Sequence, residues 1–177
     1  MKTTSDSPMT KSPLMMGGGK LKWIVAAAAV ASLAVGWYMF RPELLFINQK
    51  VNEAFPIAAA DGSTAELIAM GRFKSLAHET NGAASIHHAD GKRVLRLTEF
   101  ETSNGPDVHV YLVAAADATD NETVTKAGFI DLGSLKGNVG DQNYDIPADV
   151  DLDKYKAVTI WCARFSVNFG TAPLNAG

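Results

Sequence analysis

The feature that most constrains this chain is an uninterrupted apolar run near its N-terminus, WIVAAAAVASLAVGWYMF at residues 23–40. The run carries no charge, and as a helix it would span about 27 Å, close to the ~30 Å hydrocarbon core of a bilayer. Trp23 at one end and Trp37, Tyr38 and Phe40 at the other are placed like interfacial aromatic residues. The run therefore predicts a single transmembrane helix.

Two other interpretations of this run are open. A core helix of a soluble domain is one, although the run has no polar face to turn toward water. A cleaved signal peptide is the other, since Ala29-Val30-Ala31 has the small-x-small form of a cleavage site. Cleavage there would leave only a short apolar stretch before the site, and the remaining apolar residues would stay at the N-terminus of the mature protein. An uncleaved signal-anchor is the interpretation we favour.

The basic residues around the run predict its orientation. Arg41 and Lys50 are the basic residues that follow it closely. Four lysines precede it: Lys2, Lys11, Lys20 and Lys22. Because cytoplasmic flanks carry the excess of Lys and Arg, the N-terminus is expected in the cytoplasm and the C-terminal part on the extracytoplasmic side. The predicted location is the plasma (inner) membrane, with a single pass.

Charge also bears on the class of partner. Residues 1–50 carry six basic and two acidic residues, a net charge of +4, whereas residues 51–177 carry ten basic and seventeen acidic residues, a net charge of −7. An acidic domain repels phosphate backbones, so we expect no nucleic-acid partner.

The composition along the chain predicts four parts. Residues 1–19 are expected to be a disordered cytoplasmic tail, residues 20–41 the transmembrane anchor, residues 42–70 a stalk and residues 71–177 a globular domain. Within the stalk, the capping-box spacing of Ser63 and Glu66, with Gly71 after it, predicts a short helix over 64–70.

The globular part alternates short β-rich runs with turns and has no amphipathic helix between them. Asp90-Gly91 joins two such runs and is a strong signal for a hairpin, because a type I′ turn needs positive φ. Residues 118–128 are predicted to be a polar loop, and residues 157–169, AVTIWCARFSVNF, to be the longest strand. This pattern predicts an all-β fold, an antiparallel β-sandwich preceded by a single transmembrane helix.

The only cysteine, Cys162, lies within the predicted last strand. Alternation along that strand places Trp161 and Phe165 on the core face, and Cys162 on the other face, where apolar residues give way to polar ones. We therefore expect a half-covered thiol near the rim of the sheet. One cysteine excludes an internal disulfide and a C-x-x-C pair, and no hydrolase or nucleotide-binding motif is present.

The histidines offer few metal sites by sequence alone. His87 and His88 are neighbours in a strand and should point to opposite faces, so they are not expected to share one ion. His109 lies on the polar face of its strand, and no His or Met follows Cys162 as in blue-copper proteins. The acidic residues Asp117, Asp120 and Glu122 match no calcium loop and are expected to be solvated.

Four blocks in order resemble the DM-thirteen domain, an extracytoplasmic family often described as electron-transfer and found beside DOMON domains. They are GRF with His78 after it, VLRLTEFETSNGPDVHVYL, IDLGSLKGNVGDQNYDIP and VTIWCARFSVNFGTAPL. The resemblance implies a β-sandwich and a redox role for the family's cysteine, here Cys162, as a bare thiol or as ligand to a prosthetic group such as haem. His78 or His109 is the expected additional ligand.

Two functions remain open at this point. The first is a membrane-anchored extracytoplasmic redox or electron-transfer module that acts through Cys162, with a redox protein as its partner. The second is a non-enzymatic binding or adhesion β-sandwich with a structural cysteine, because a free cysteine is most often a small buried hydrophobe. For the second, the expected binding surface is formed by residues 105–107 and the loop at 115–127.

Overall fold

The structure, a computed structural model, describes residues 18–40, 47–55 and 65–177. The chain divides into two compact units, Met1–Phe40 and Arg41–Gly177, and each is described by itself.

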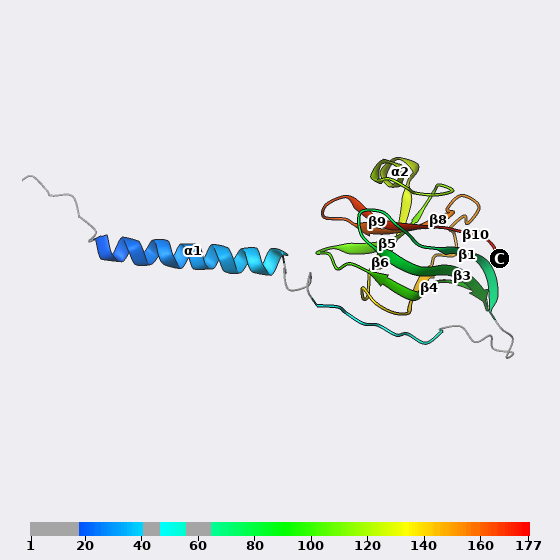
Figure 1. The fold of residues 1–177 in the computed structure, drawn as a ribbon, viewed down its shortest axis with the longest axis horizontal. Helices are drawn as coiled ribbons and strands as arrows, with labels where there is room; N and C mark the ends of the chain where they lie inside the picture. The colour runs from blue at the N-terminus through cyan, green and yellow to red at the C-terminus, as the bar shows by residue number, and fades with distance from the viewer. Residues whose placement is uncertain (1–17, 41–46, 56–64) are drawn as a thin grey trace, which may run out of the picture. The chain divides into compact units, whose positions relative to one another are not determined.

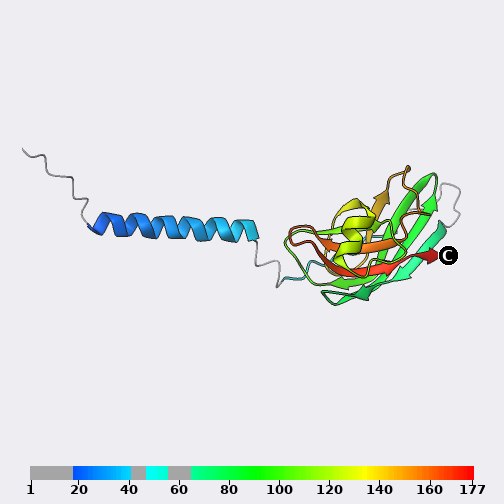
Figure 2. The same cartoon turned by 90° about the horizontal axis from the view of Figure 1, so that it is seen from above.

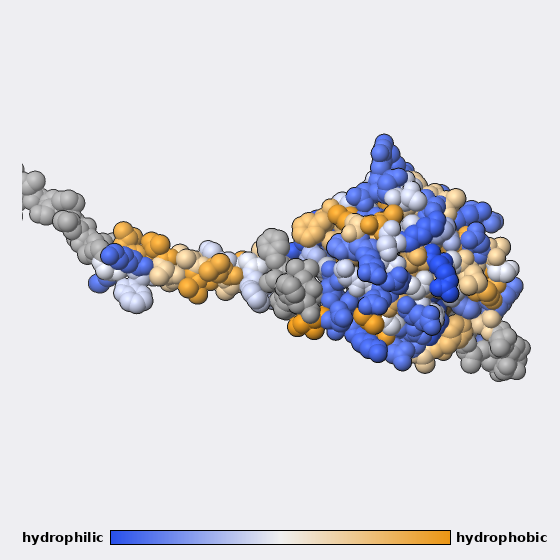
Figure 3. All heavy atoms as spheres, in the orientation of Figure 1, coloured by the Kyte–Doolittle hydropathy of each residue, from blue (hydrophilic) through white to orange (hydrophobic). Residues whose placement is uncertain are grey.

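The first unit contains the helix α1 (Gly18–Phe40), which carries Lys20 and Lys22 in its first turns. Its apolar side chains are exposed, and Figure 3 shows hydrophobic residues along the face of the helix that is in view. The segment Gly19–Met39 is long and apolar enough to cross a membrane. Length and composition are those of a single membrane span, as the sequence predicted.

The second unit is a sandwich of two antiparallel sheets (Figures 1 and 2). In spatial order the first sheet contains β10 (Asn175–Ala176), β1 (Glu66–Arg72), β3 (Thr80–Ala89), β4 (Lys92–Thr102) and β7 (Gln142–Ile146). The second sheet contains β2 (Lys74–Ser75), β9 (Val167–Pro173), β8 (Ala157–Cys162), β5 (Val108–Val113) and β6 (Phe129–Ser134). The predicted all-β sandwich is confirmed.

Turn chemistry fixes the hairpin between β3 and β4. Asp90 and Gly91 both have positive φ, 50° and 74°, as a two-residue hairpin turn requires. The hairpin brings Ile86 opposite Leu95 and Ala84 opposite Leu97. All four of these side chains point into the space between the sheets.

Alternation along the strands builds the main core. In β5 and the first half of β4 every second residue faces the opposite sheet, and these inward apolar residues are buried. The largest fully buried side chains that β4 and β5 give to this core are Phe100, Leu95, Leu97, Leu112 and Val110. A second, smaller core lies on the outer face of the second sheet, beneath α2 (Asn121–Ala127), and includes Val124 and Trp161.

Three local predictions are wrong. Residues 66–70 lie in β1 and not in a helix, because they pair with β3 on one side and β10 on the other. Part of the predicted polar loop is α2, which Asp120 caps by accepting a hydrogen bond from the backbone N–H of Thr123. The single long strand at 157–169 is two strands, β8 and β9, joined by a turn at 163–166.

Candidate functional site

Cys162 is the last residue of β8, opposite Val108 of β5 and Val167 of β9. Only 1% of its surface is exposed, and it belongs to the core between the two sheets. The prediction of a half-covered thiol is therefore wrong. The polar residues that follow, such as Arg164, belong to the turn and do not extend the face on which Cys162 lies.

The two faces of β8 are both covered, which the sequence did not reveal. Val158, Ile160 and Cys162 face the main core, whereas Ala157 and Trp161 face the smaller core beneath α2. Every residue of β8 is consequently buried. Phe165, predicted to be a core residue, lies in the turn and is 59% exposed.

His109 lies on the outer face of the second sheet, opposite Trp161. Its Nδ1 lies 2.9 Å from a carboxylate oxygen of Asp131, and its Nε2 lies 3.1 Å from one of Asp107. Partial burial lowers the pKa of His109, but the hydrogen bonds to Asp131 and Asp107 outweigh it, so the pKa lies above 6.5. Both ring nitrogens are already engaged by carboxylates and offer no free lone pair to a metal.

His78 lies between β2 and β3, at the end of the sandwich where β9 begins. Its ring packs on Phe169, with the two ring centroids 3.8 Å apart. Phe169 belongs to the same core as Cys162. His78 also lines a polar cavity of about 430 Å³ together with Glu79, Glu101 and Asn104.

The neighbouring histidines do not form a metal site either. The ring of His87 packs edge-on against Phe55, and its Nε2 lies 2.9 Å from the hydroxyl of Ser85. Burial and the nearby Arg96 hold the pKa of His87 below 6.5. In the part of the chain that the structure describes, no group of three or more His, Cys, Asp or Glu side chains could hold a metal ion.

Haem does not fit the residues that the sequence proposed for it. Cys162 is enclosed by apolar neighbours, and it lines none of the cavities described in this section. His109 projects from the opposite face of the same strand pair, so it cannot share an iron with Cys162. His78 packs on Phe169. The arrangement holds a buried thiol, without space for a porphyrin beside it.

A segment outside the predicted domain completes this unit. Residues 47–55, here called the strap, lie along the loop that leads into β7. The backbone N–H of Val51 donates to the carbonyl of Val139 over 2.9 Å, and that of Glu53 donates to Asp141 over 2.9 Å. A Cβ at Gly137 would overlap the carbonyl oxygen of Gln49, so this loop needs glycine where the strap passes.

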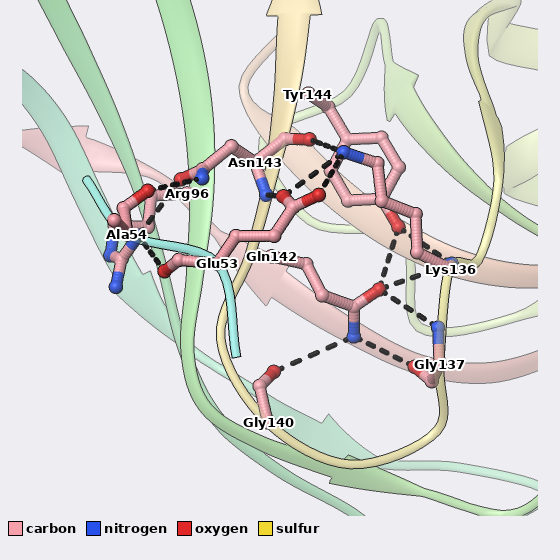
Figure 4. Close-up of polar contacts among 9 residues, drawn as sticks. All are labelled: Glu53, Ala54, Arg96, Lys136, Gly137, Gly140, Gln142, Asn143 and Tyr144. Carbon is pink, nitrogen blue, oxygen red and sulfur yellow. Dashed lines mark hydrogen bonds and ion pairs between the residues drawn. The ribbon is translucent and has the colours of Figure 1, made fainter. Parts of the chain in front are cut away.

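The strap carries one charged anchor, Glu53 (Figure 4). Its carboxylate accepts hydrogen bonds from Lys136 Nζ, at 2.8 and 3.0 Å, and from the backbone N–H of Asn143 at 2.7 Å. Partial burial raises the pKa of Glu53, but the contacts with Lys136 and Asn143 outweigh it, so the pKa lies below 4.5. Asn143 Nδ2 donates in turn to the carbonyl of Ala54.

Beneath the strap, a buried amide holds the receiving loop. Gln142 is fully buried, and its Oε1 accepts from the backbone N–H groups of Lys136 and Gly137 and from the hydroxyl of Tyr144. Its Nε2 donates to the carbonyl of Gly137 over 2.7 Å. Burial is the main cause that raises the pKa of Tyr144 to about 12. The network fixes the loop on which the strap docks (Figure 4).

The strap also forms part of the walls of three cavities. Asn48 lines the cavity beside His78. Gln49 lines a second cavity of about 290 Å³, which is bounded by residues 104–108. Glu53 lines a third of about 650 Å³, over Tyr144. The sequence missed these residues because only the folded chain brings residues 47–55 beside residues 136–143.

Comparison with known proteins identifies the domain. No curated protein and no solved structure matches the chain. A family model described as "Electron transfer DM13" matches residues 72–174, which is more than half of the 177 residues. The match covers β2 to β9, including β8 with Cys162. The chain belongs to the DM13 family of electron-transfer domains.

Proposed function

We propose that the protein is a membrane-tethered redox module whose electron-carrying group is the thiol of Cys162. Membership of an electron-transfer family supports a redox role, and Cys162 is the only cysteine in the chain. The observation that carries the assignment is its position as the last residue of β8, directly before a turn. A thiol at a strand end is reached by opening that turn, without breaking the centre of the sheet.

The chemistry of a lone thiol is thiol–disulfide exchange with a second molecule. The Cys162 thiolate attacks one sulfur of an incoming disulfide, the S–S bond of that disulfide breaks, and a new bond forms to Cys162 Sγ. The second sulfur leaves as a thiolate and takes up the proton that Cys162 gave up. Cys162 is oxidised to a mixed disulfide and the leaving sulfur is reduced to a thiol, so the reaction needs a disulfide-bearing redox partner.

The turn after Cys162 has the properties of a segment that opens locally. Ser166 has a φ of 53°, in the left-handed region, and Phe165 exposes its ring to solvent. A backbone hydrogen bond from the N–H of Ala163 to the carbonyl of Asp107, 2.8 Å long, ties the start of the turn to the residue before β5. Few apolar contacts and an exposed backbone are the features of low local stability.

The apolar helix α1 supports a location for this chemistry at a membrane. The lysines before and within α1 outnumber the basic residues that follow it closely, which favours a cytoplasmic N-terminus and an extracytoplasmic domain. An extracytoplasmic compartment supplies disulfides, whereas the cytosol keeps thiols reduced. A protease-protection assay on sealed spheroplasts checks the side, because digestion of the domain from outside supports this orientation.

The experiment for the redox role uses the full chain in lipid nanodiscs. The protein is equilibrated in glutathione buffers of graded potential, and the peptide that contains Cys162 is weighed by mass spectrometry. A reversible glutathione adduct with one midpoint potential supports the proposal, and Cys162→Ala serves as the negative control. An optical spectrum is recorded on the same sample before and after dithionite. A Soret band that is present in the wild type and absent in Cys162→Ala would contradict the thiol mechanism and indicate haem bound through Cys162.

A second function, a binding module with a structural cysteine, is favoured by one observation. The cavity of about 290 Å³ is bounded by Gly105, Pro106 and Asp107, the loop that the sequence proposed for recognition, and the strap closes one side of it. This function predicts a ligand whose affinity is the same in wild type and in Cys162→Ala. A ligand lost only on substitution of the cysteine would contradict it.

A further inference from the structure

The strap is held by a receiving surface that is built for it. Its backbone pairs with residues 139 and 141, and two glycines leave room for it: a Cβ at Gly137 would overlap Gln49, and one at Gly140 would overlap the carbonyl oxygen of Val51. The strap lies outside residues 72–174, the range matched to the family.

We propose that the strap is an acid-sensitive latch, docked while Glu53 is ionised and His87 is neutral and released when both take up protons. The two groups lie at different points along the strap. Glu53 is the strap's own charged anchor, whereas His87 belongs to β3 and supports the ring of Phe55 at the strap's end. Each contact weakens on protonation for a separate physical reason.

For Glu53 the reason is loss of a charge-assisted contact. The ionised carboxylate accepts from the Lys136 ammonium and from the Asn143 N–H, and protonation removes the negative charge that both contacts need. Because the pKa of Glu53 in the docked state lies below 4.5, its stabilisation of the docked strap is present above pH 4.5 and is lost as the pH falls through the docked-state pKa.

For His87 the reason is burial of a new charge beside a cation. Its ring lies against Phe55, its Nδ1 is buried without a hydrogen-bond partner, and the Arg96 guanidinium lies 5.5 Å from the centre of the Phe55 ring. An imidazolium here would have a buried N–H donor and a like charge nearby. The pKa of docked His87 lies below 6.5, so its stabilisation of the docked strap is present above pH 6.5 and is lost progressively below it.

The charged groups around His87 support this direction. From β4, Arg96 faces it, and Arg96 is itself paired with Asp141 over 2.6 Å. From β1 the residue opposite is apolar, Leu67, and from β4 it is Val94, beyond which β7 places Asp145. Among the described residues, Arg96 is therefore the charged group whose field acts on His87, and burial acts in the same direction.

Release of the strap changes the surface around the loop end of the sandwich. Asn48 would leave the wall of the cavity beside His78, and Gln49 would leave the cavity at residues 104–108. The hydrogen bond from Asn104 Nδ2 to the carbonyl of Ile47, 2.7 Å long, would break as well. The latch thus couples acidification to the opening of two polar cavities.

The test is hydrogen exchange followed by mass spectrometry on the full chain in lipid nanodiscs, between about pH 7.5 and about pH 4, with intrinsic rates corrected for pH. The reporters are the amides of Val51 and Glu53, which donate to Val139 and Asp141. Their opening equilibrium should rise by up to about tenfold for each pH unit below 6.5, while β8 stays protected.

Matched variants separate the two protonation sites. His87→Gln should flatten the pH dependence between about pH 7 and about pH 5, whereas His88→Gln, its neighbour on the other face of β3, should leave it unchanged. Glu53→Gln should raise strap exchange already at neutral pH. Strap protection that does not change on acidification would overturn the proposal, as would an equal loss in His87→Gln or a parallel loss of protection in β8.

Discussion

Cys162 and His109 are carried by the same pair of strands and project to opposite faces of it. Cys162 lies opposite Val108 and points into the core between the sheets, and the next residue along β5, His109, lies opposite Trp161 on the outer face. The one cysteine and the histidine expected to assist it are therefore separated by the sheet. This relationship excludes His109 as a second ligand to an iron bound by Cys162.

Substitution of Cys162 should reveal the apolar character of its surroundings. Cys162→Ser places a hydroxyl among the apolar side chains of the main core, so we expect it to lower the free energy of unfolding by about 1–3 kcal/mol more than Cys162→Ala. Chemical denaturation of the full chain in detergent measures the difference. Equal stability of the two variants would mean that the thiol has a polar environment.

Two phenylalanines of the C-terminal hairpin should respond very differently. Phe169 is 3% exposed and Phe165 is 59% exposed. Phe169→Ala should lower the free energy of unfolding by about 3–5 kcal/mol, whereas Phe165→Ala should change it by less than about 0.5 kcal/mol. Thermal denaturation followed by circular dichroism compares them. A large effect of Phe165→Ala would mean that Phe165 is buried, as the single long strand predicted from the sequence requires.

The pH dependence of stability should carry a contribution from His109. Its pKa in the folded protein is raised above 6.5, so the stabilisation is fully present below pH 6.5 and is lost as the pH rises through the folded-state pKa. Asp131→Asn should lower this pKa, because it removes one of the two carboxylates that contact the ring. NMR titration of the imidazole measures the pKa directly.

A His109 pKa that stays in place in Asp131→Asn, with Asp107 intact, would contradict the assigned role of Asp131.

A methyl group at Gly140 should disturb the strap selectively. Its Cβ would overlap the carbonyl oxygen of Val51, and its φ is +102°. Gly133 has a similarly positive φ of +118° but open space around it, so Gly133→Ala isolates the backbone strain. Gly140→Ala should destabilise the domain by about 1–3 kcal/mol more than Gly133→Ala. Equal stability of the two would mean that the strap does not need this close approach.

Much of the fold could be predicted because local signals decide it. The Asp90-Gly91 turn specifies a hairpin through positive φ, and alternation in residues 108–113 specifies a strand with one inward face. The uncharged run at 23–40 specifies a helix long enough for a bilayer. These signals act over a few residues and need no knowledge of the rest of the chain.

The errors lie where distant contacts decide the structure. The helix expected over 64–70 is a strand because β3 and β10 complete its hydrogen bonding, which overrides a capping signal in seven residues. The turn at 163–166 contains no Gly or Pro, so the sequence pattern continues as a strand through it. That continued alternation wrongly predicts Cys162 at the rim of the sheet.

The strap shows the same limit for the candidate site. Glu53 is one of many acidic residues in the sequence, and nothing local distinguishes it. Its partners, Lys136 and Asn143, are 83 and 90 positions further along the chain. Sequence analysis found the candidate cysteine because the chain has only one, but it could not find a docking surface that exists only after folding.

The central claim, that the buried Cys162 thiol is reached by local opening of the strand end, is tested most directly by its alkylation kinetics. The full chain in nanodiscs is labelled with a thiol reagent at increasing denaturant, and the opening free energy from labelling is compared with that of global unfolding. The account predicts a labelling free energy well below the global value and nearly independent of denaturant. Labelling that requires global unfolding would contradict it and would make Cys162 a structural residue of the core.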